Sequence, residues 1–297
     1  MAAQYEVLRT GVGAVELERD FLEVKGPQAL EYLQGQLSQD VEPLAIGDAA
    51  LSFLLEPQGK VVALLRVVRV ADDVFVLDVD AGHGAAVSER LNRFKLRTKV
   101  TIEPLAWRCV GLRGPDATGH AHAHVPTGGA LIVVPVDWPG LAGVDVIGPD
   151  IAAPLEVPRV DKAYEVARIE AGIPKMGAEL TDRTIPAETG IVDRAVSFTK
   201  GCYTGQELVA RIDARGGNVP RQLRGVVVAH SDPPPAGAAI TAGDKNIGWV
   251  TSAAPRPGGD AVALAYIQRG NEPPLDAEVT WDGASAAARV EALPLIS

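Results

Sequence analysis

Cysteine is scarce in this sequence, which has two cysteines, Cys109 and Cys202, in 297 residues. The two are far apart, so the sequence contains no CxxC pair, no zinc-knuckle spacing and no disulfide framework. Such cysteine usage is typical of a reducing compartment, where disulfides rarely persist. We therefore expect a cytoplasmic protein without a cysteine-based metal site.

Long apolar runs are also absent. The longest one, residues 61–70, is interrupted by Arg66 and Arg69. It is much shorter than the roughly 20 apolar residues that a bilayer-spanning helix needs. The first ten residues lack both the basic opening and the apolar core of a signal peptide. We expect no membrane partner.

Positive charge is in deficit, with 28 Lys and Arg against 38 Asp and Glu and a formal net charge of -10. Binding to phosphates requires a surplus of cations on the contact surface, so this balance argues against direct nucleic-acid binding. A local exception lies between residues 194 and 224, where six basic residues face two acidic ones. The six are Arg194, Lys200, Arg211, Arg215, Arg221 and Arg224. This stretch is either a solvated loop or a patch for an anionic ligand.

Histidine is scarce as well, and three of the five histidines alternate at positions 120, 122 and 124. On a strand they would share one face and could bind a metal ion. However, no acidic residue or cysteine lies close by, and the nearby Gly128-Gly129 indicates a loop. We expect no metal site there.

The stretch that stands out is residues 200–207, KGCYTGQE. Cys202 lies two residues after Lys200 and between two glycines, so the backbone can turn tightly and the thiol need not be covered. A nearby ammonium favours the thiolate, which is the form that attacks electrophiles or binds metals. The alternative is a small apolar residue packed in a turn, the usual role of a free cysteine.

KGCYTGQE resembles the signature of the YgfZ-type folate-binding proteins. These are relatives of the T-protein (aminomethyltransferase) of the glycine cleavage system, in the GcvT superfamily. Two more segments match at the spacing of that superfamily, namely residues 168–172 (RIEAG) and 185–188 (IPAE). The resemblance also covers the N-terminal third and roughly the last eighty residues, and therefore nearly the whole chain.

The hydrophobic pattern predicts an α+β fold. A strand at 21–24, a Gly-Pro turn and a helix at 29–37 are followed by a similar unit at 109–117, which suggests an internal duplication. Strands at 51–55, 61–70, 74–79 and 100–103 with a helix between 81 and 96 indicate an inserted α+β unit. A helix is expected at 159–171 and a strand at 208–212. Short strands from 224 to 290, separated by Pro- and Gly-rich turns, predict a small barrel or sandwich.

The resemblance implies a GcvT/YgfZ-like multidomain ring with antiparallel sheets, helices and a small C-terminal β-barrel. Residues 1–48 and 106–220 are expected to form a discontinuous folate-binding α+β region that carries the signature. Residues 49–105 would be an inserted ferredoxin-like unit, and residues 221–297 the barrel.

The resemblance also implies a cofactor, tetrahydrofolate or a folate derivative. In folate-binding relatives the glutamate of the RxEAG motif accepts hydrogen bonds from the pterin, which implies this role for Glu170; the alternative is a surface glutamate paired with Arg168 or Lys175. Cys202 would be the reactive thiol, with Lys200 favouring its thiolate. The other expected folate-binding residues are Arg168, Tyr203, Gln206, Glu207, Arg194 and Arg211.

A catalytic acid is missing. The T-protein carries an aspartate on the hairpin that corresponds to residues 59–65, where this chain has Ala63 and Leu64. An aminomethyl transfer would lack its proton-handling group. The resemblance implies an accessory protein of iron-sulfur cluster assembly or repair. Its expected partners are folate and iron-sulfur assembly proteins or client enzymes. Two alternatives stay open: a folate-dependent aminomethyltransferase or demethylase-like enzyme, and a binding module in which Cys202 is packing.

Overall fold

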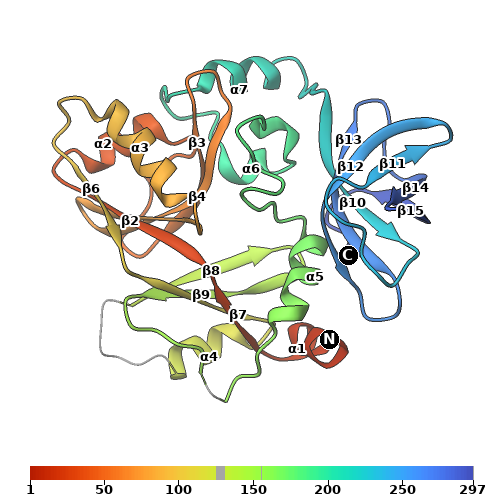
Figure 1. Cartoon of the computed structure of the whole chain (residues 1–297). Helices are drawn as coiled ribbons and strands as arrows, with labels where there is room; N and C mark the ends of the chain where they lie inside the picture. Colours follow the sequence, from red (N-terminus) through yellow and green to blue (C-terminus); the bar gives the residue numbers. More distant parts are fainter. Residues whose placement is uncertain (125–130, 155, 297) are drawn as a thin grey trace.

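The structure is a computed structural model that describes residues 1–124, 131–154 and 156–296, without the side chains of residues 122–124. Its described strands form a five-stranded sheet, a four-stranded sheet and a closed six-stranded barrel, arranged around a common centre (Figure 1). Helix α5 (Asp161–Ala171) stands between the four-stranded sheet and the barrel. The expected α+β fold with antiparallel sheets and a C-terminal barrel is confirmed.

The five-stranded sheet has the order β3-β4-β5-β2-β6, and every neighbouring pair is antiparallel. Its strands are β2 (Arg19–Lys25), β3 (Ala49–Leu55), β4 (Val61–Ala71), β5 (Val74–Asp80) and β6 (Thr101–Leu105). Helices α2 (Ala29–Gln36) and α3 (Gly84–Lys95) contribute Leu33, Val87 and Leu91 to the core on one face. Because β2 precedes residue 48, this sheet draws strands from both sides of the expected boundary at 48/49. The domain boundaries stay a prediction.

The four-stranded sheet has the order β1-β7-β9-β8. Its strands are β1 (Gly13–Leu17), β7 (Arg108–Arg113), β8 (Ile132–Trp138) and β9 (Leu141–Gly148). Helix α4 (Ala117–His124) contributes Ala117 and Ala121 to the core cluster on one face of this sheet, and helix α1 (Ala2–Thr10) contacts α5.

The two Gly-Pro turns occupy equivalent places, one between β2 and α2 and the other between β7 and α4. Gly26 has a φ of +143° and Gly114 a φ of +116°. A Cβ atom would come within 2.3 Å of the Lys99 carbonyl oxygen at the first glycine and 2.2 Å of the Gly11 carbonyl oxygen at the second. Each turn therefore requires glycine for the same reason, a close approach of another backbone segment.

The alternating histidines lie in helix α4 and not on a strand. Positions two apart share a face on a strand but not on a helix, so the strand geometry considered for these histidines is wrong. The side chains of His122 and His124 lie outside the described residues. Among the residues that are described, no group of three or more His, Cys, Asp or Glu is suited to hold a metal ion.

The C-terminal barrel closes in the order β10-β13-β12-β11-β14-β15. Its strands are β10 (Arg221–Val228), β11 (Ala239–Ala242), β12 (Lys245–Pro255), β13 (Ala261–Gln268), β14 (Leu275–Trp281) and β15 (Ala284–Glu291). Its core combines valine and isoleucine with small alanines such as Ala263 and Ala265, which suit a narrow barrel. On another face of the barrel, Val166 and Ile169 of α5 pack against Leu264 and Tyr266.

The expected strand at 208–212 is wrong, because this segment belongs to helix α7 (Gln206–Asp213). Gly205 adopts a φ of +88° immediately before the helix and turns the chain into it. Leu208, Val209 and Ile212 have the i, i+1, i+4 spacing of one helix face, and Val209 is buried there.

Between α5 and α7 lie a 3-10 helix, η1 (Pro186–Glu188), and the short helix α6 (Val192–Ala195). No helix in the described ranges is long and apolar enough to cross a membrane.

Candidate functional site

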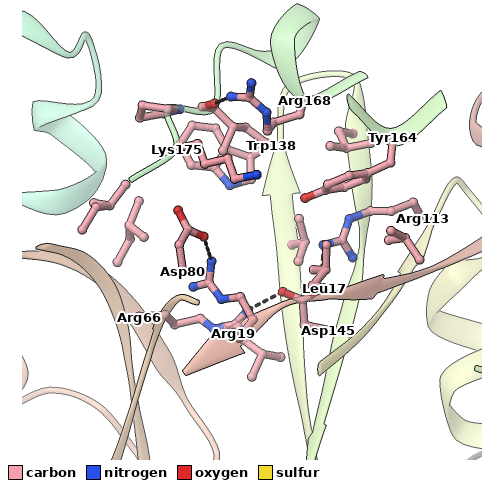
Figure 2. Close-up of a pocket in the computed structure, with 18 of the residues that line it drawn as sticks. Leu17, Arg19, Arg66, Asp80, Arg113, Trp138, Asp145, Tyr164, Arg168 and Lys175 are labelled. Atoms are coloured by element: carbon pink, nitrogen blue, oxygen red, sulfur yellow. Dashed lines mark hydrogen bonds and ion pairs between the residues drawn. The ribbon is translucent and has the colours of Figure 1, made fainter. Parts of the chain in front are cut away.

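A cavity of about 570 Å³ lies where the two sheets, α5 and the segment after α5 meet. Its volume falls within the range of roughly 300–1,000 Å³ that is usual for small-molecule sites. Figure 2 places Trp138, Lys175 and Arg168 at one end and Arg19, Arg66 and Asp145 at the other. Residues from distant parts of the chain therefore line one space.

Helix α5 presents a stripe of polar side chains to the cavity. Asp161, Tyr164, Glu165 and Arg168 all line it, and their i, i+3, i+4, i+7 spacing places them on one helix face. Arg168 donates from Nε to Glu165 Oε2 at 2.9 Å and from Nη2 to Glu165 Oε1 at 2.7 Å. This two-bond pair holds the guanidinium in a fixed orientation along the wall.

Interleaved arginines and aspartates join the two sheets at the other end of the cavity. Asp145 of β9 accepts a hydrogen bond from Arg66 of β4 at 2.7 Å and one from Arg113 of β7 at 2.6 Å. Arg66 also pairs with Asp78 of β5, whose other oxygen accepts a bond from Arg19 at 2.5 Å. The five-stranded and four-stranded sheets are thus linked through charged side chains and not only through apolar packing.

The protonation of Asp145 is fixed by this network. Burial by itself raises the pKa of the carboxyl, but Arg113 and Arg66 outweigh burial and lower the pKa from 3.8 to about 2. Burial alone would lower the pKa of both guanidiniums, whereas the neighbouring carboxylates raise it. The Nε atoms of Arg66 and Arg113 are buried and have no hydrogen-bond partner within the described part of the chain.

The opposite end of the cavity is more open and carries two cations. The Arg194 guanidinium lies 4.3 Å from the centroid of the Trp138 ring and pairs with the exposed Asp137. Lys175 lines the cavity as well, and its ammonium has no hydrogen-bond or ion-pair partner in the described ranges. An anionic ligand group entering here would meet a cation that no carboxylate neutralises.

An apolar wall faces these charges. Leu51, Leu64 and Met176 line the cavity, and Ala63 is fully buried behind it. The backbone N–H of Leu64 donates to Met176 Sδ at 3.4 Å. The place where the resemblance leads one to look for an acid therefore holds hydrocarbon and a thioether, neither of which transfers protons.

The KGCYTGQE loop does not line this cavity. Its lysine is hydrogen-bonded to the backbone, whereas its cysteine is exposed. The Lys200 ammonium donates to the carbonyl oxygens of Gln34, Leu37 and Gln39 at 2.7, 2.9 and 2.8 Å. Burial lowers the pKa of Lys200 from 10.5 to about 8. Lys200 therefore fixes the loop at residues 34–39, while Cys202 is exposed and does not line the cavity.

Comparison with known proteins places the chain in a family. Residues 1–126 match the family described as GCVT N-terminal domain. An uncharacterized protein of Haemophilus influenzae is 31% identical over 202 residues, which is 66% of this chain and 67% of that protein. The chain belongs to the GcvT superfamily and is a YgfZ-type protein.

Other relatives of this YgfZ-type protein carry different names. A tRNA-modifying protein YgfZ of Klebsiella pneumoniae is 27% identical over 91% of this chain and 89% of its own length. A mitochondrial iron-sulfur cluster assembly factor IBA57 homolog of Neurospora crassa is 28% identical over 70% of this chain, and the chain spans 52% of that longer protein. The crystal structure of aminomethyltransferase T from Bartonella henselae superposes with a TM-score of 0.84 at 22% identity, covering 99% of this chain and 89% of that one. This likeness shows the fold.

In this YgfZ-type protein the two charged residues of the RxEAG motif face opposite ways. Positions two apart on a helix are separated by about 200°, so Arg168 lines the cavity and Glu170 does not. Glu170 is fully buried and accepts hydrogen bonds from Tyr5 and Arg9, each at 2.7 Å, and from Arg256 at 2.9 Å. The role of Glu170 in pterin binding stays a prediction. To bind Glu170, a pterin would have to replace Tyr5, Arg9 or Arg256 as hydrogen-bond donor.

The remaining expected folate-binding residues are dispersed. Arg194 lines the cavity, whereas Tyr203, Gln206, Glu207 and Arg211 do not. Tyr203 is buried in the core beside α2 and has the Lys200 ammonium 5.4 Å from its ring centroid, and Glu207 and Arg211 are exposed on α7. The basic stretch at 194–224 is therefore not one patch, since Arg221 packs on Trp249 and Tyr266 of the barrel.

Several cavity residues were missed by sequence reasoning, although the sequence carries a signal for them. Arg66 and Asp145, which line the cavity, and Asp78, which pairs with Arg66, each interrupt an apolar strand. They lie in the runs LLRVV, VDVI and VLDVD. A charge within such a strand is costly unless a partner lies on a neighbouring strand. These interruptions could have predicted a buried ion network, but not which strands supply the partners.

Proposed function

We propose that the protein binds tetrahydrofolate in the central cavity and acts as an accessory protein of iron-sulfur cluster assembly or repair. The observation that carries the proposal is the cavity itself, with an apolar wall at one side and an unneutralised ammonium at its open end. The name of the IBA57 relative, an iron-sulfur cluster assembly factor, supports the second half of the proposal. We also propose a cytoplasmic location. Direct nucleic-acid binding is not included, since the net charge is -10.

The residues of the cavity fit a folate in both its parts. A pteridine is flat and largely apolar on its faces, and Leu51, Leu64 and Met176 offer a surface for such a ring. The glutamyl carboxylates of folate need cations, and Lys175 and Arg194 supply them.

The same cavity argues against a classical aminomethyltransferase. Ala63 and Leu64 occupy the hairpin position of the catalytic acid, and the carboxylates of Asp80, Asp145 and Glu165 in the cavity each pair with an arginine. Proton transfer by any of these three would have to begin by breaking its ion pair. Glu18 also lines the cavity and has no arginine partner among the described residues, but it is exposed and does not lie on the hairpin of the missing acid. We therefore expect no formaldehyde or methylene-tetrahydrofolate from small methylated amines.

Calorimetric titration with tetrahydrofolate tests the binding site. Lys175→Met should weaken binding about three- to tenfold, the size of one partly exposed ion pair. Lys162→Met is the matched control, because Lys162 is exposed on α5 and does not line the cavity. It should leave the affinity within about twofold of wild type.

Tetrahydropterin, which lacks the glutamate, sharpens this test. It should bind wild type and Lys175→Met equally, because the lost ammonium has no carboxylate to contact. The cavity is not the folate site if wild type fails to bind tetrahydrofolate, or if both lysine variants weaken it alike.

Cys202 is the proposed reactive thiol, and its exposure is compatible with contact to a partner protein. In cells that lack the protein, Cys202→Ala should fail to restore the activity of an iron-sulfur enzyme while its purified form keeps wild-type tetrahydrofolate affinity. Cys109→Ala, which changes the buried cysteine, should restore activity. Full restoration by Cys202→Ala would exclude the reactive-thiol role and leave a folate-binding module.

A further inference from the structure

Glu179 joins the barrel to the cavity. Its carboxylate is fully buried, and both of its oxygens accept hydrogen bonds. Oε1 accepts hydrogen bonds from the hydroxyls of Thr251 at 2.7 Å and Ser252 at 2.6 Å, both on β12. Oε2 accepts one from the backbone N–H of Lys175 at 2.9 Å and lies 3.4 Å from Arg168 Nη1. A buried carboxylate is stable only with such partners, so these contacts hold its position firmly.

A bulge in β12 makes this double contact possible. Consecutive side chains on a regular strand point to opposite faces, so two adjacent hydroxyls do not normally reach one oxygen atom. The pairing of β12 with β13 shifts between Val250 and Ser252, and Thr251 is the extra residue. The bulge turns Thr251 and Ser252 toward the same atom of Glu179.

Residues 173–180, which we call the strap, run from this contact to the five-stranded sheet. Ile173, Pro174, Lys175 and Met176 line the cavity. The backbone N–H of Met176 donates to Asp80 Oδ2 at 2.9 Å, and its thioether accepts from the Leu64 N–H. The strap is therefore fixed to the barrel through Glu179 and to β4 and β5 through Met176, and Lys175 directly precedes Met176.

We propose that Glu179, held by Ser252 and Thr251, is a positioning residue that sets the place of Lys175 at the cavity, so that the barrel controls the anion-binding end of the site. This inference rests on the proposed function, in which Lys175 contacts a folate carboxylate. Glu179 touches no ligand itself. It acts through the Lys175 backbone N–H, to which it is directly bonded.

Ser252→Ala is the test variant, because it removes one donor to Glu179 without altering any cavity side chain. It should weaken tetrahydrofolate binding about three- to tenfold, as far as Lys175→Met does. Combining Ser252→Ala with Lys175→Met should give no further loss, since both changes remove the same contact. Additive losses would overturn the proposal, because they would show that Ser252 acts independently of Lys175.

Tyr5→Phe is the matched control. It removes one hydroxyl donor from Glu170, the other fully buried glutamate of this region, which does not line the cavity. Both variants should lower the melting temperature by about 2–4 °C, yet Tyr5→Phe should keep wild-type affinity for tetrahydrofolate. Equal losses of affinity in the two variants would reduce the role of Ser252 to general stability.

Amide hydrogen exchange in the ligand-free protein separates this inference from the proposed function. Ser252→Ala should speed exchange at Lys175 and Met176, and Tyr5→Phe should not. If wild type does not bind tetrahydrofolate, the proposed function fails while the exchange data still test the strap. If wild type binds and Ser252→Ala binds equally well, the positioning role fails while the folate site stands.

Discussion

Asp145 is the shared anion of the ion network that links the five-stranded sheet to the four-stranded sheet, which we call the joint. It is 6% exposed and lies between the guanidiniums of Arg66 and Arg113, one from each sheet. Taking three charges out of water is costly, and the mutual attraction of the charges offsets this cost only when all of them are present. The joint should therefore be sensitive to acid.

The first prediction concerns the pH dependence of stability. The folded-state pKa of Asp145 is lowered from 3.8 to about 2, so its stabilising contribution is complete above pH 4 and is lost as the pH falls toward 2. Over this interval the loss amounts to about 2 kcal/mol. Urea unfolding of wild type and Asp145→Asn measures it.

Asp145→Asn should be less stable than wild type at pH 7 by about 3–5 kcal/mol, because two buried guanidiniums lose their shared anion. Its unfolding free energy should fall by about 2 kcal/mol less than that of wild type between pH 4 and pH 2, since it has no carboxyl to protonate. Parallel pH profiles for the two proteins would show that Asp145 does not titrate in this range.

Helix α7 is the element that the signature builds. Gly205 has a φ of +88°, and a Cβ atom there would come within 2.7 Å of the Glu56 carbonyl oxygen and 2.8 Å of Leu55 Cβ. The glycine thus allows α7 to begin against the hairpin at residues 55–61. Gly201, in the same signature, has open space around it.

The second prediction compares these two glycines. Gly205→Ala should lower the free energy of unfolding by about 2 kcal/mol or more. Alanine is strained in the left-handed conformation, and its Cβ atom would also clash with the Glu56 carbonyl oxygen. Gly201→Ala should change it by less than about 0.5 kcal/mol, as for an ordinary surface substitution. Chemical denaturation measures both, and a larger loss at Gly201 would contradict the assignment.

At the scale of the whole molecule, buried charges attach the barrel to the rest of the chain. Arg221 of β10 donates to Glu188 of η1 at 3.0 and 3.1 Å and stacks on Trp249 and Tyr266. Arg256, just after β12, pairs with Glu170 of α5. Together with Glu179, these contacts surround the apolar packing between α5 and the barrel.

The third prediction tests this attachment. Arg221→Met should cost about 3–5 kcal/mol, because Glu188 stays buried without its cation. Arg289→Met is the control, since Arg289 also pairs with two carboxylates but is exposed on the barrel, and it should cost less than about 1 kcal/mol. Adding Glu188→Gln to Arg221→Met should recover part of the loss. No recovery would mean that the ring stacking, and not the ion pair, holds the barrel.

The sequence alone identified much of the architecture, because it depends on local patterns. The apolar runs predicted the strands of the five-stranded sheet, and the short runs after residue 220 predicted a barrel or sandwich, but β1, β8 and β9 of the four-stranded sheet were missed. The prediction of a strand at 208–212 was wrong because the apolar residues of this segment suit both a short strand and one face of a helix. Only Gly205 and the packing of Val209 against the core decided between the two.

For the functional site too, the sequence predicted some features and only the structure showed the others. KGCYTGQE and the missing acid at Ala63 and Leu64 could be read from the sequence, since both are contiguous. Which side chains meet in the cavity could not, because Arg19, Asp145 and Lys175 come from three distant segments. The sequence determined the family and most of the elements, since these depend on neighbouring residues. The tertiary structure alone decided that Arg168 faces the cavity, that Glu170 does not, and that the barrel reaches the site through Glu179, because each of these facts depends on contacts between distant residues.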